Sequence, residues 1–164
     1  MSRLAIAIEQ LDATRRYTRM VLSHTPHERW FEMPAGCPSH VAWQVGHLGL
    51  AMAQHAWRTV CGRELGEVLP AEHAAWFGKG SAAVPDAAMY PTPGELTERM
   101  ELIYDESVAA LGELDESVMT EPATHATGLI RTKFDLVMYN ARHEMLHVGQ
   151  IGLIRRLLGL PPYR

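Results

Sequence analysis

Four stretches of the chain carry apolar residues at the three- and four-residue spacing of an amphipathic helix. They cover residues 2–23, 40–60, 93–114 and 133–158, and segments rich in proline or glycine separate them. No stretch alternates polar and β-branched residues for long enough to predict a sheet. Four helices of about 20 residues that share an apolar stripe predict an all-α four-helix bundle, built as a single domain over residues 1–164.

Three of the predicted helices begin at recognisable capping signals. Thr92 is followed by proline and, three residues on, by Glu95, which is the pattern of a capping box. Thr132 and Asp135 repeat the spacing at the start of the fourth helix. Ser39, which follows a proline, is the expected N-cap of the second helix.

The connection between the second and third helices, residues 61–91, is long for a bundle. It contains the aromatic residues Trp76, Phe77 and Tyr90, and we expect a short helical turn around residues 71–77. Connections of this length commonly form lids over functional sites or hold additional short helices. The sequence leaves open whether this connection covers the site or lies away from it.

One side of the second helix carries small residues, among them Gly46 and Gly49. Glycine inside a helix costs up to ~1 kcal/mol relative to alanine. Two glycines on one strip therefore predict that another helix approaches very closely. The alternative is that this helix simply tolerates them.

The composition, 47% hydrophobic and 21% charged with a net charge of −4, is typical of a soluble globular protein. It excludes a disordered tail and a collagen-like repeat, and no apolar run approaches the roughly 18 residues that span a bilayer. We therefore expect no membrane partner. The chain has no basic patch, so we also expect no nucleic-acid partner. The two cysteines are too few for a disulfide framework, and with no N-terminal signal pattern we expect a reduced, cytoplasmic protein.

Nine histidines in 164 residues are unusual, and the fourth helix holds two of them one turn apart, His143 and His147. They lie on the apolar stripe of that helix, and His47 lies on the inner side of the second helix. The expected interior polar residues are His40, His47, Gln54, Asn140, His143, His147 and Gln150. Such an interior is too polar to be only a core, because buried polar groups need partners.

A divalent metal ion would satisfy these nitrogens. Three imidazoles, from His47, His143 and His147, form a set that leaves at least one coordination position for water or substrate. Imidazole suits zinc, nickel, copper and iron, of which we expect zinc or nickel. Asn140 and Gln150, one turn on either side of the pair, are candidates to orient the ligands.

The alternative for each histidine is an ordinary structural or surface role. A His-x-x-x-His pair alone is more often two unremarkable residues than a site, and the third interior histidine is what favours a metal. His40 and His55 lie near the site by helical phase, but we interpret them as neighbours of the site or exposed residues. The remaining four, in predicted loops or at helix ends, are expected on the surface: His24, His27, His73 and His125.

The stretch from His143 to His147 also matches the His-Glu-x-x-His signature of zinc proteases, with Glu144 as general base. Such proteases take their third ligand from downstream. Beyond Met145 this chain has no acidic residue and no histidine other than His147. The protease reading is therefore disfavoured, and Glu144, about 100° around the helix from His143, is expected to be peripheral.

The residues Trp43-Gln44-Val45-Gly46-His47-Leu48, followed by His143-Glu144-Met145-Leu146-His147-Val148-Gly149-Gln150, resemble the DinB superfamily, which includes the YfiT-like proteins. Many members have a second histidine where this chain has Leu146. The resemblance implies an up-down-down-up bundle, a homodimer and one divalent ion on His47, His143 and His147. Members with known chemistry are thiol-dependent transferases that use bacillithiol or mycothiol, and a mycothiol-dependent maleylpyruvate isomerase.

Three functions fit these residues. The first is a metal-dependent enzyme similar to thiol S-transferases, in which the metal activates a low-molecular-weight thiol or water to attack a small-molecule substrate. Gln54 and Arg58 lie on the His47 face, and Arg58 is a candidate to hold a carboxylate of the thiol or substrate. The second is a metal-dependent hydrolase, and the third is a non-enzymatic metal-binding or stress-associated protein.

The fourth helix is apolar on a second side as well, which carries Val137, Met138, Ala141, Met145 and Val148. A helix that is hydrophobic nearly all round must be buried on both sides. We therefore expect this second side to form a subunit interface.

Overall fold

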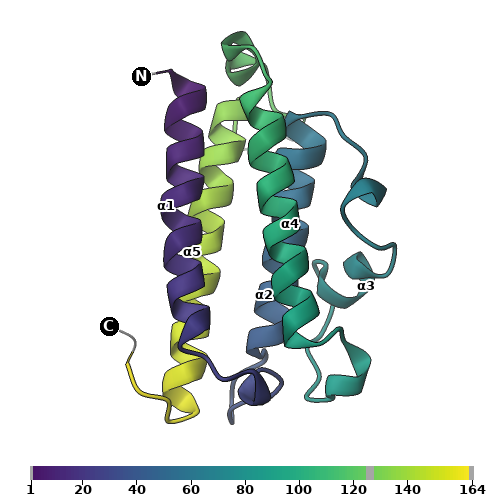
Figure 1. The fold of residues 1–164 in the computed structure, drawn as a ribbon, viewed down its shortest axis with the longest axis vertical. Coiled ribbons are helices and arrows are strands. Elements are labelled where there is room, and N and C mark those ends of the chain that lie inside the picture. Colours follow the sequence, from purple (N-terminus) through teal and green to yellow (C-terminus); the bar gives the residue numbers. More distant parts are fainter. Residues whose placement is uncertain (1, 125–127, 163–164) are drawn as a thin grey trace.

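The computed structural model describes residues 2–124 and 128–162 and is built from helices (Figure 1). The long helices are α1 (Arg3–Ser23), α2 (Val41–Met52), α4 (Pro93–Gly112) and α5 (Lys133–Leu157). Within the described ranges no strand forms, and the sole β-type pairing is an isolated bridge between Pro122 and Thr132. The all-α class is confirmed, and no helix in those ranges is long and apolar enough to cross a bilayer.

The four long helices lie side by side (Figure 1), with α1 packed against α5 and α2 against α4. In the view of Figure 1, α1 and α5 run downward and α2 and α4 run upward. The core between them is aliphatic and includes Leu11, Val41, Met100, Ile103 and Ile151, each at most 1% exposed. Burial of this surface is the main stabilising contribution to the fold.

The predicted capping boxes form at both expected sites. The Thr92 side chain accepts from the backbone N–H of Glu95 at the start of α4, and Thr132 accepts from Asp135 at the start of α5. The predicted cap of α2 is wrong, because His40, and not Ser39, is the N-cap. Its Nδ1 accepts the backbone N–H of Trp43 at 3.0 Å. An imidazole nitrogen replaces the usual hydroxyl oxygen.

The second helix is not a regular α-helix to its end. After Met52 it continues as a π-helix, η2 (Ala53–Val60), in which the Cys61 N–H donates to the Ala56 carbonyl at 3.0 Å. A five-residue repeat widens the turn and rotates the following side chains relative to the expected helical phase. Within this segment His55, and not Gln54, hydrogen-bonds to α5, through Asn140.

The connection after η2 contains three short helical segments and packs against α2. These are η3 (Leu65–Glu67), α3 (His73–Phe77) and η4 (Ala87–Met89), and α3 falls where a short helical turn is expected. The predicted surface position of His73 is wrong. Its ring is 3% exposed and its Nε2 lies 3.0 Å from the Gly46 carbonyl, so it fastens α3 to α2.

The glycines of α2 allow close contacts on two sides. A Cβ atom at Gly46 would lie 2.6 Å from the Phe77 ring, and one at Gly49 would lie 3.3 Å from Cδ1 of Ile103 on α4. The close approach predicted from the sequence is therefore present. Its tightest partner, however, is an aromatic side chain of α3 rather than one of the long helices.

We expect Gly46→Ala to lower the free energy of unfolding by about 1–3 kcal/mol, because the new methyl group overlaps a buried ring. In an uncrowded helix the same change would stabilise by up to ~1 kcal/mol. Gly49→Ala is the matched control, since its one tight contact, at 3.3 Å, is with the end of the flexible Ile103 side chain. Urea unfolding of both variants measures the difference, and equal stabilities would contradict the packing described here.

A buried ion pair joins α1 to α5. Arg15, fully buried, donates from Nε and Nη2 to the Glu144 carboxylate at 2.9 and 3.0 Å, and from Nη1 to the Met100 carbonyl at 3.0 Å. Thr18 donates to the same carboxylate at 2.6 Å. The expected peripheral position of Glu144 is wrong, because its side chain is buried against α1. The two side chains can be buried because their opposite charges compensate each other.

The second apolar side of α5 is largely used within the chain. Val137, Ala141 and Val148 are at most 5% exposed, while Met145 and Leu146 are 42% and 68% exposed. Because α1 is the main neighbour of α5, most of the side assigned to a subunit interface packs against α1 instead. The remaining short segments are η1 (His27–Arg29) and η5 (Glu116–Thr120).

Candidate metal centre

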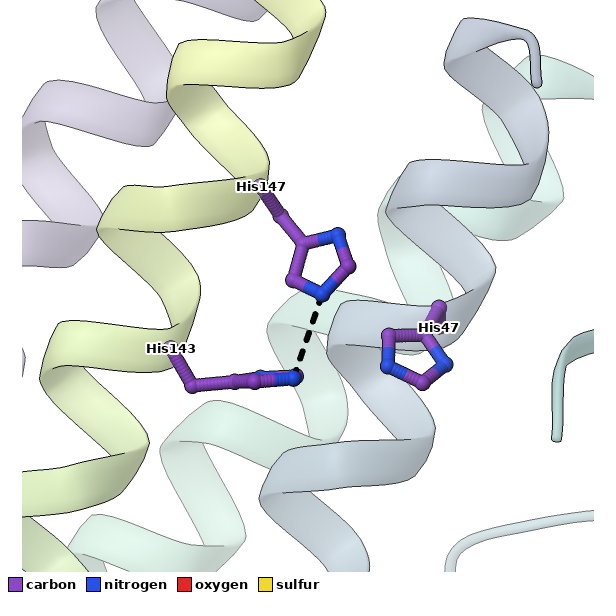
Figure 2. A group of neighbouring side chains, drawn as sticks. All are labelled: His47, His143 and His147. Atoms are coloured by element: carbon purple, nitrogen blue, oxygen red, sulfur yellow. Dashed lines mark hydrogen bonds between the residues drawn. The ribbon is translucent and has the colours of Figure 1, made fainter. Parts of the chain in front are cut away.

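Three imidazole rings converge between α2 and α5. His47 projects from α2 and His143 and His147 from α5, toward one another (Figure 2). One nitrogen of each ring lies within 4.8 Å of the others, and the Nε2 atoms of His143 and His147 are 3.1 Å apart. Metal–nitrogen bonds of ~2.0–2.1 Å at tetrahedral angles require separations of about 3.3 Å. Among the described residues this is the one group with the donors and spacing to hold a metal ion.

Hydrogen bonds at the far side of two rings fix which nitrogen faces the centre. His47 Nδ1 lies 2.7 Å from the Phe77 carbonyl and His147 Nδ1 lies 2.5 Å from Oε1 of Gln44. Carbonyl oxygens only accept, so each Nδ1 carries the proton and each Nε2 keeps its lone pair. This is the arrangement that metal-binding histidines have when an outer carbonyl orients them.

The donor set fits a divalent transition metal. The Nε2 lone pairs of His47 and His147 face the space between the three rings. Among the described residues, no group hydrogen-bonds the buried Nδ1 of His143. Burial and the neighbouring imidazoles lower the pKa of His143 to about 4 and that of His147 to about 3. Both rings are therefore neutral at pH 7, which is the protonation state that ligation requires.

Gln44 is a residue of this site that the sequence analysis missed. It is 3% exposed, accepts from His147 and donates from Nε2 to the Ser39 hydroxyl at 2.8 Å, which fixes the direction of its amide. Its place three residues before His47 puts it on the same helical face. That spacing was the available signal, since a glutamine on the histidine face of a buried helix needs a polar partner.

We expect Gln44→Ala to weaken zinc binding by about 10–100-fold, because the imidazole of His147 loses the acceptor that orients it. Competition with a chromogenic chelator measures the dissociation constant. The matched control is Gln10→Ala, which removes an exposed glutamine of α1. An unchanged zinc affinity in Gln44→Ala would show that the amide does not support the ligand.

The connection 61–91 is fastened to the same face of α2. His40 Nε2 lies 3.0 Å from the Val84 carbonyl, and Trp43 Nε1 donates to the Ser81 hydroxyl at 3.0 Å. Both contacts join the part of α2 before His47 to the part of the connection after Phe77. The Trp43 indole also stacks on the His47 ring, with centroids 4.9 Å apart and planes 8° apart. His40 thus anchors the connection and caps α2, and it is not part of the ligand cluster.

Asn140 supports a fourth histidine rather than the three ligands. Its Oδ1 accepts from His55 Nδ1 at 3.0 Å, and its Nδ2 contacts the sulfur of Met52 at 3.1 Å. The His55 ring packs edge-on against His143, with centroids 6.1 Å apart. Burial lowers the pKa of His55. His55 is therefore a neutral neighbour of the cluster, as its helical phase indicated.

The other residues singled out from the sequence lie around this cluster. Gln150 is exposed, and its hydrogen bond to His147 opposes the effect of burial on the pKa of that ring. Gln54 and Arg58 line a cleft on η2 that also contains His55. His24 and His27 are exposed as expected, and His125 lies outside the described residues.

Acidification should destabilise the metal-free protein. Burial lowers the pKa below the ordinary 6.5 for His40, His55, His73, His143 and His147. Between pH 6.5 and about 4 the unfolded chain binds protons that these folded rings do not, so the free energy of unfolding falls as the pH falls. Urea midpoints measured across this range would decrease. A midpoint independent of pH would contradict the neutral, buried state of these rings.

Comparison with known protein families identifies the chain. The family model described as DinB superfamily matches residues 10–151. The chain belongs to the DinB superfamily. The match extends over most of the chain and includes all three histidines of the cluster, and the DinB superfamily binds metal ions. Among curated proteins, none matches the sequence.

Proposed function

We propose that this DinB superfamily protein is a metal-dependent enzyme that holds one zinc or nickel ion on the Nε2 atoms of His47, His143 and His147. The observation that carries the proposal is the convergence of three imidazoles, two of them fixed with the lone pair inward by Phe77 and Gln44. Three protein ligands are typical of catalytic sites, whereas structural sites usually have four.

Thiol transfer is the reaction class that we favour. When bound, a divalent ion acts as a Lewis acid that lowers the pKa of a thiol or water and so supplies a nucleophile at neutral pH. The protein contributes three uncharged ligands, which leave the ion's positive charge uncompensated and thereby favour an anionic partner such as a thiolate. The stacked Trp43 and the carbonyl of Phe77 hold the His47 ring in place.

The proposal includes a homodimeric four-helix bundle in up-down-down-up order. The opposite directions of the α1–α5 and α2–α4 pairs in Figure 1 support this order. Leu146, Leu153 and Leu157, which recur at helical spacing on α5 and are 47–68% exposed, support the dimer. Sedimentation analysis of the full chain tests the dimer.

The decisive experiment assays the zinc- and nickel-loaded protein with low-molecular-weight thiols and an aromatic or epoxide electrophile, and follows formation of the thioether. We expect turnover that depends on both metal and thiol and that is lost in His143→Ala. Thiol-independent hydrolysis of esters or amides would instead indicate a hydrolase. Full metal occupancy without turnover of any substrate would indicate a non-enzymatic metal-binding protein and would contradict the proposal.

A further inference from the structure

A cleft of about 210 Å³ lies beside the candidate metal centre, between η2 and the first turns of α5. One wall is polar and comes from η2, and the other is apolar and comes from α5 and the segment before it. The lining residues are Gln54, His55, Arg58, Thr59, Ala123, Ile130 and Leu136. The volume corresponds to about seven water molecules at ~30 Å³ each, which suits a small metabolite.

His55 connects this cleft to the three-histidine cluster. The residue lines the cleft, and the same ring packs edge-on against His143 and is held by Asn140 on α5. Leu136, on the opposite wall, lies one turn before Asn140 on the same helix. A small molecule in the cleft would therefore have one end against His55, next to the metal ligands, and the other toward Arg58.

Among the described residues, Arg58 is a cation without a charged partner. It takes part in none of the ion pairs of the described residues, whereas other arginines of α1, η1 and the connection do. Among the described residues that line the cleft, none is acidic. A cleft lined by an exposed guanidinium without an acidic partner and by apolar side chains favours an amphipathic anion. A carboxylate can accept two parallel hydrogen bonds from the N–H groups of the Arg58 guanidinium.

The π-helical geometry of η2 is a second, independent observation. π-helices are rare, usually a single turn within an α-helix, and are found frequently at functional sites. Here the wide turns bring Gln54 and His55 onto the same side as Arg58 and Thr59, whose hydroxyl donates to the Gln54 carbonyl at 2.7 Å. The irregular segment thus builds the polar wall of the cleft.

We propose that this cleft binds a carboxylate of the small molecule on which the metal centre acts, with the carboxylate at Arg58 and the reacting end beyond His55, at the three-histidine cluster. Only the placement of the reacting end at the three-histidine cluster rests on the proposed function. The carboxylate site at Arg58 does not depend on it. The carboxylate belongs either to the thiol or to its electrophilic partner, and the recognition at Arg58 is the same in both cases. The ligand is a short chain with a terminal carboxylate and an apolar middle.

The first test concerns the cleft alone and uses metal-free protein. Butyrate and its uncharged analogue butanol are titrated while the methyl resonances of Ile130 and Leu136 are followed by NMR. We expect butyrate to shift these resonances in the wild type and to bind at least about ten times more weakly to Arg58→Gln, a difference of 1.4 kcal/mol. Butanol should respond equally in both proteins. Arg16→Gln, which removes an exposed arginine of α1, is the matched control and should behave as the wild type.

The second test adds the metal. Calorimetry on zinc-loaded protein compares ω-mercapto acids, from mercaptoacetate to mercaptohexanoate, with mercapto alcohols of the same lengths. If Arg58 and the metal centre hold opposite ends of one ligand, the acids have an optimum chain length that the alcohols lack and that disappears in Arg58→Gln. An optimum chain length of the acids that is present with zinc and absent without it would support both the carboxylate site at Arg58 and the placement of the reacting end at the metal centre.

The outcomes separate the two proposals. Equal binding of butyrate to the wild type and to Arg58→Gln would overturn the carboxylate site whether or not the protein holds zinc. Arg58-dependent binding of butyrate by a protein that takes up no zinc would retain the anion site and refute the metal-dependent function. Arg58-dependent binding without any length optimum would overturn the claim that the cleft leads to the metal centre.

Discussion

Replacement of His47 by alanine is expected to reduce zinc affinity by more than about a hundredfold, which is more than the loss of an outer hydrogen-bond partner causes. His47 is the one ligand that α2 contributes, so without it His143 and His147 remain as two adjacent rings on a single helix. Two imidazoles one turn apart hold zinc weakly because at least two further positions fall to water. Zinc content after equilibrium dialysis against a competing chelator measures the change.

His24→Ala is the control for this experiment, because it removes an exposed histidine outside the cluster and should retain one zinc per chain. Circular dichroism and thermal melting establish that both variants fold. Tryptophan fluorescence adds a direct readout, since Trp43 stacks on His47 and its emission should respond to zinc in the wild type. Retention of tightly bound zinc by His47→Ala would refute the three-histidine centre.

The second large effect concerns stability. Arg15→Ala leaves the Glu144 carboxylate buried without its cation and is expected to cost about 3–5 kcal/mol of the free energy of unfolding. Against a total of about 5–15 kcal/mol, this is a large fraction. Urea unfolding measures it, and zinc bound per folded chain should stay at one, because Glu144 points toward α1 and away from the ligands.

A double variant distinguishes the loss of a pair from the loss of packing. Arg15→Met with Glu144→Leu removes both charges and fills similar volume, so it should recover most of the stability lost in Arg15→Ala. The same double variant tests the protease interpretation. A general base at Glu144 would make Glu144→Leu abolish any hydrolytic activity, whereas a structural carboxylate predicts that metal-dependent activity survives in the stable double variant.

Much of the fold was predictable because its signals are local. The capping boxes at Thr92 and Thr132 depend on residues three apart, and they mark the true starts of α4 and α5. The one-turn spacing of His143 and His147 likewise places both rings on one helical face. The histidine cluster followed from adding His47, since an interior nitrogen needs a partner in any fold.

What the sequence did not predict depends on tertiary contacts. The π-helix η2 has no local signal in its residues, and the hydrogen bond that His55 rather than Gln54 makes to Asn140 is a tertiary contact. Glu144 was expected at the periphery from its angle around the helix, because Arg15, its buried partner, is 129 residues away in the sequence. His73 was expected on the surface because it lies in the long connection, and its partner, the Gly46 carbonyl, is known only once α3 is placed against α2.

The carbonyl that orients His47 belongs to the main chain of Phe77, thirty residues further on. Any side chain at position 77 would supply this oxygen, so point substitutions there act through ring packing and not through the acceptor. Insertions and deletions are different, because a change of length between residues 77 and 84 would shift the oxygen relative to α2. The length of this loop therefore fixes the orientation of the His47 ring, and a change in that length would alter the candidate metal centre without replacing any of its three histidines.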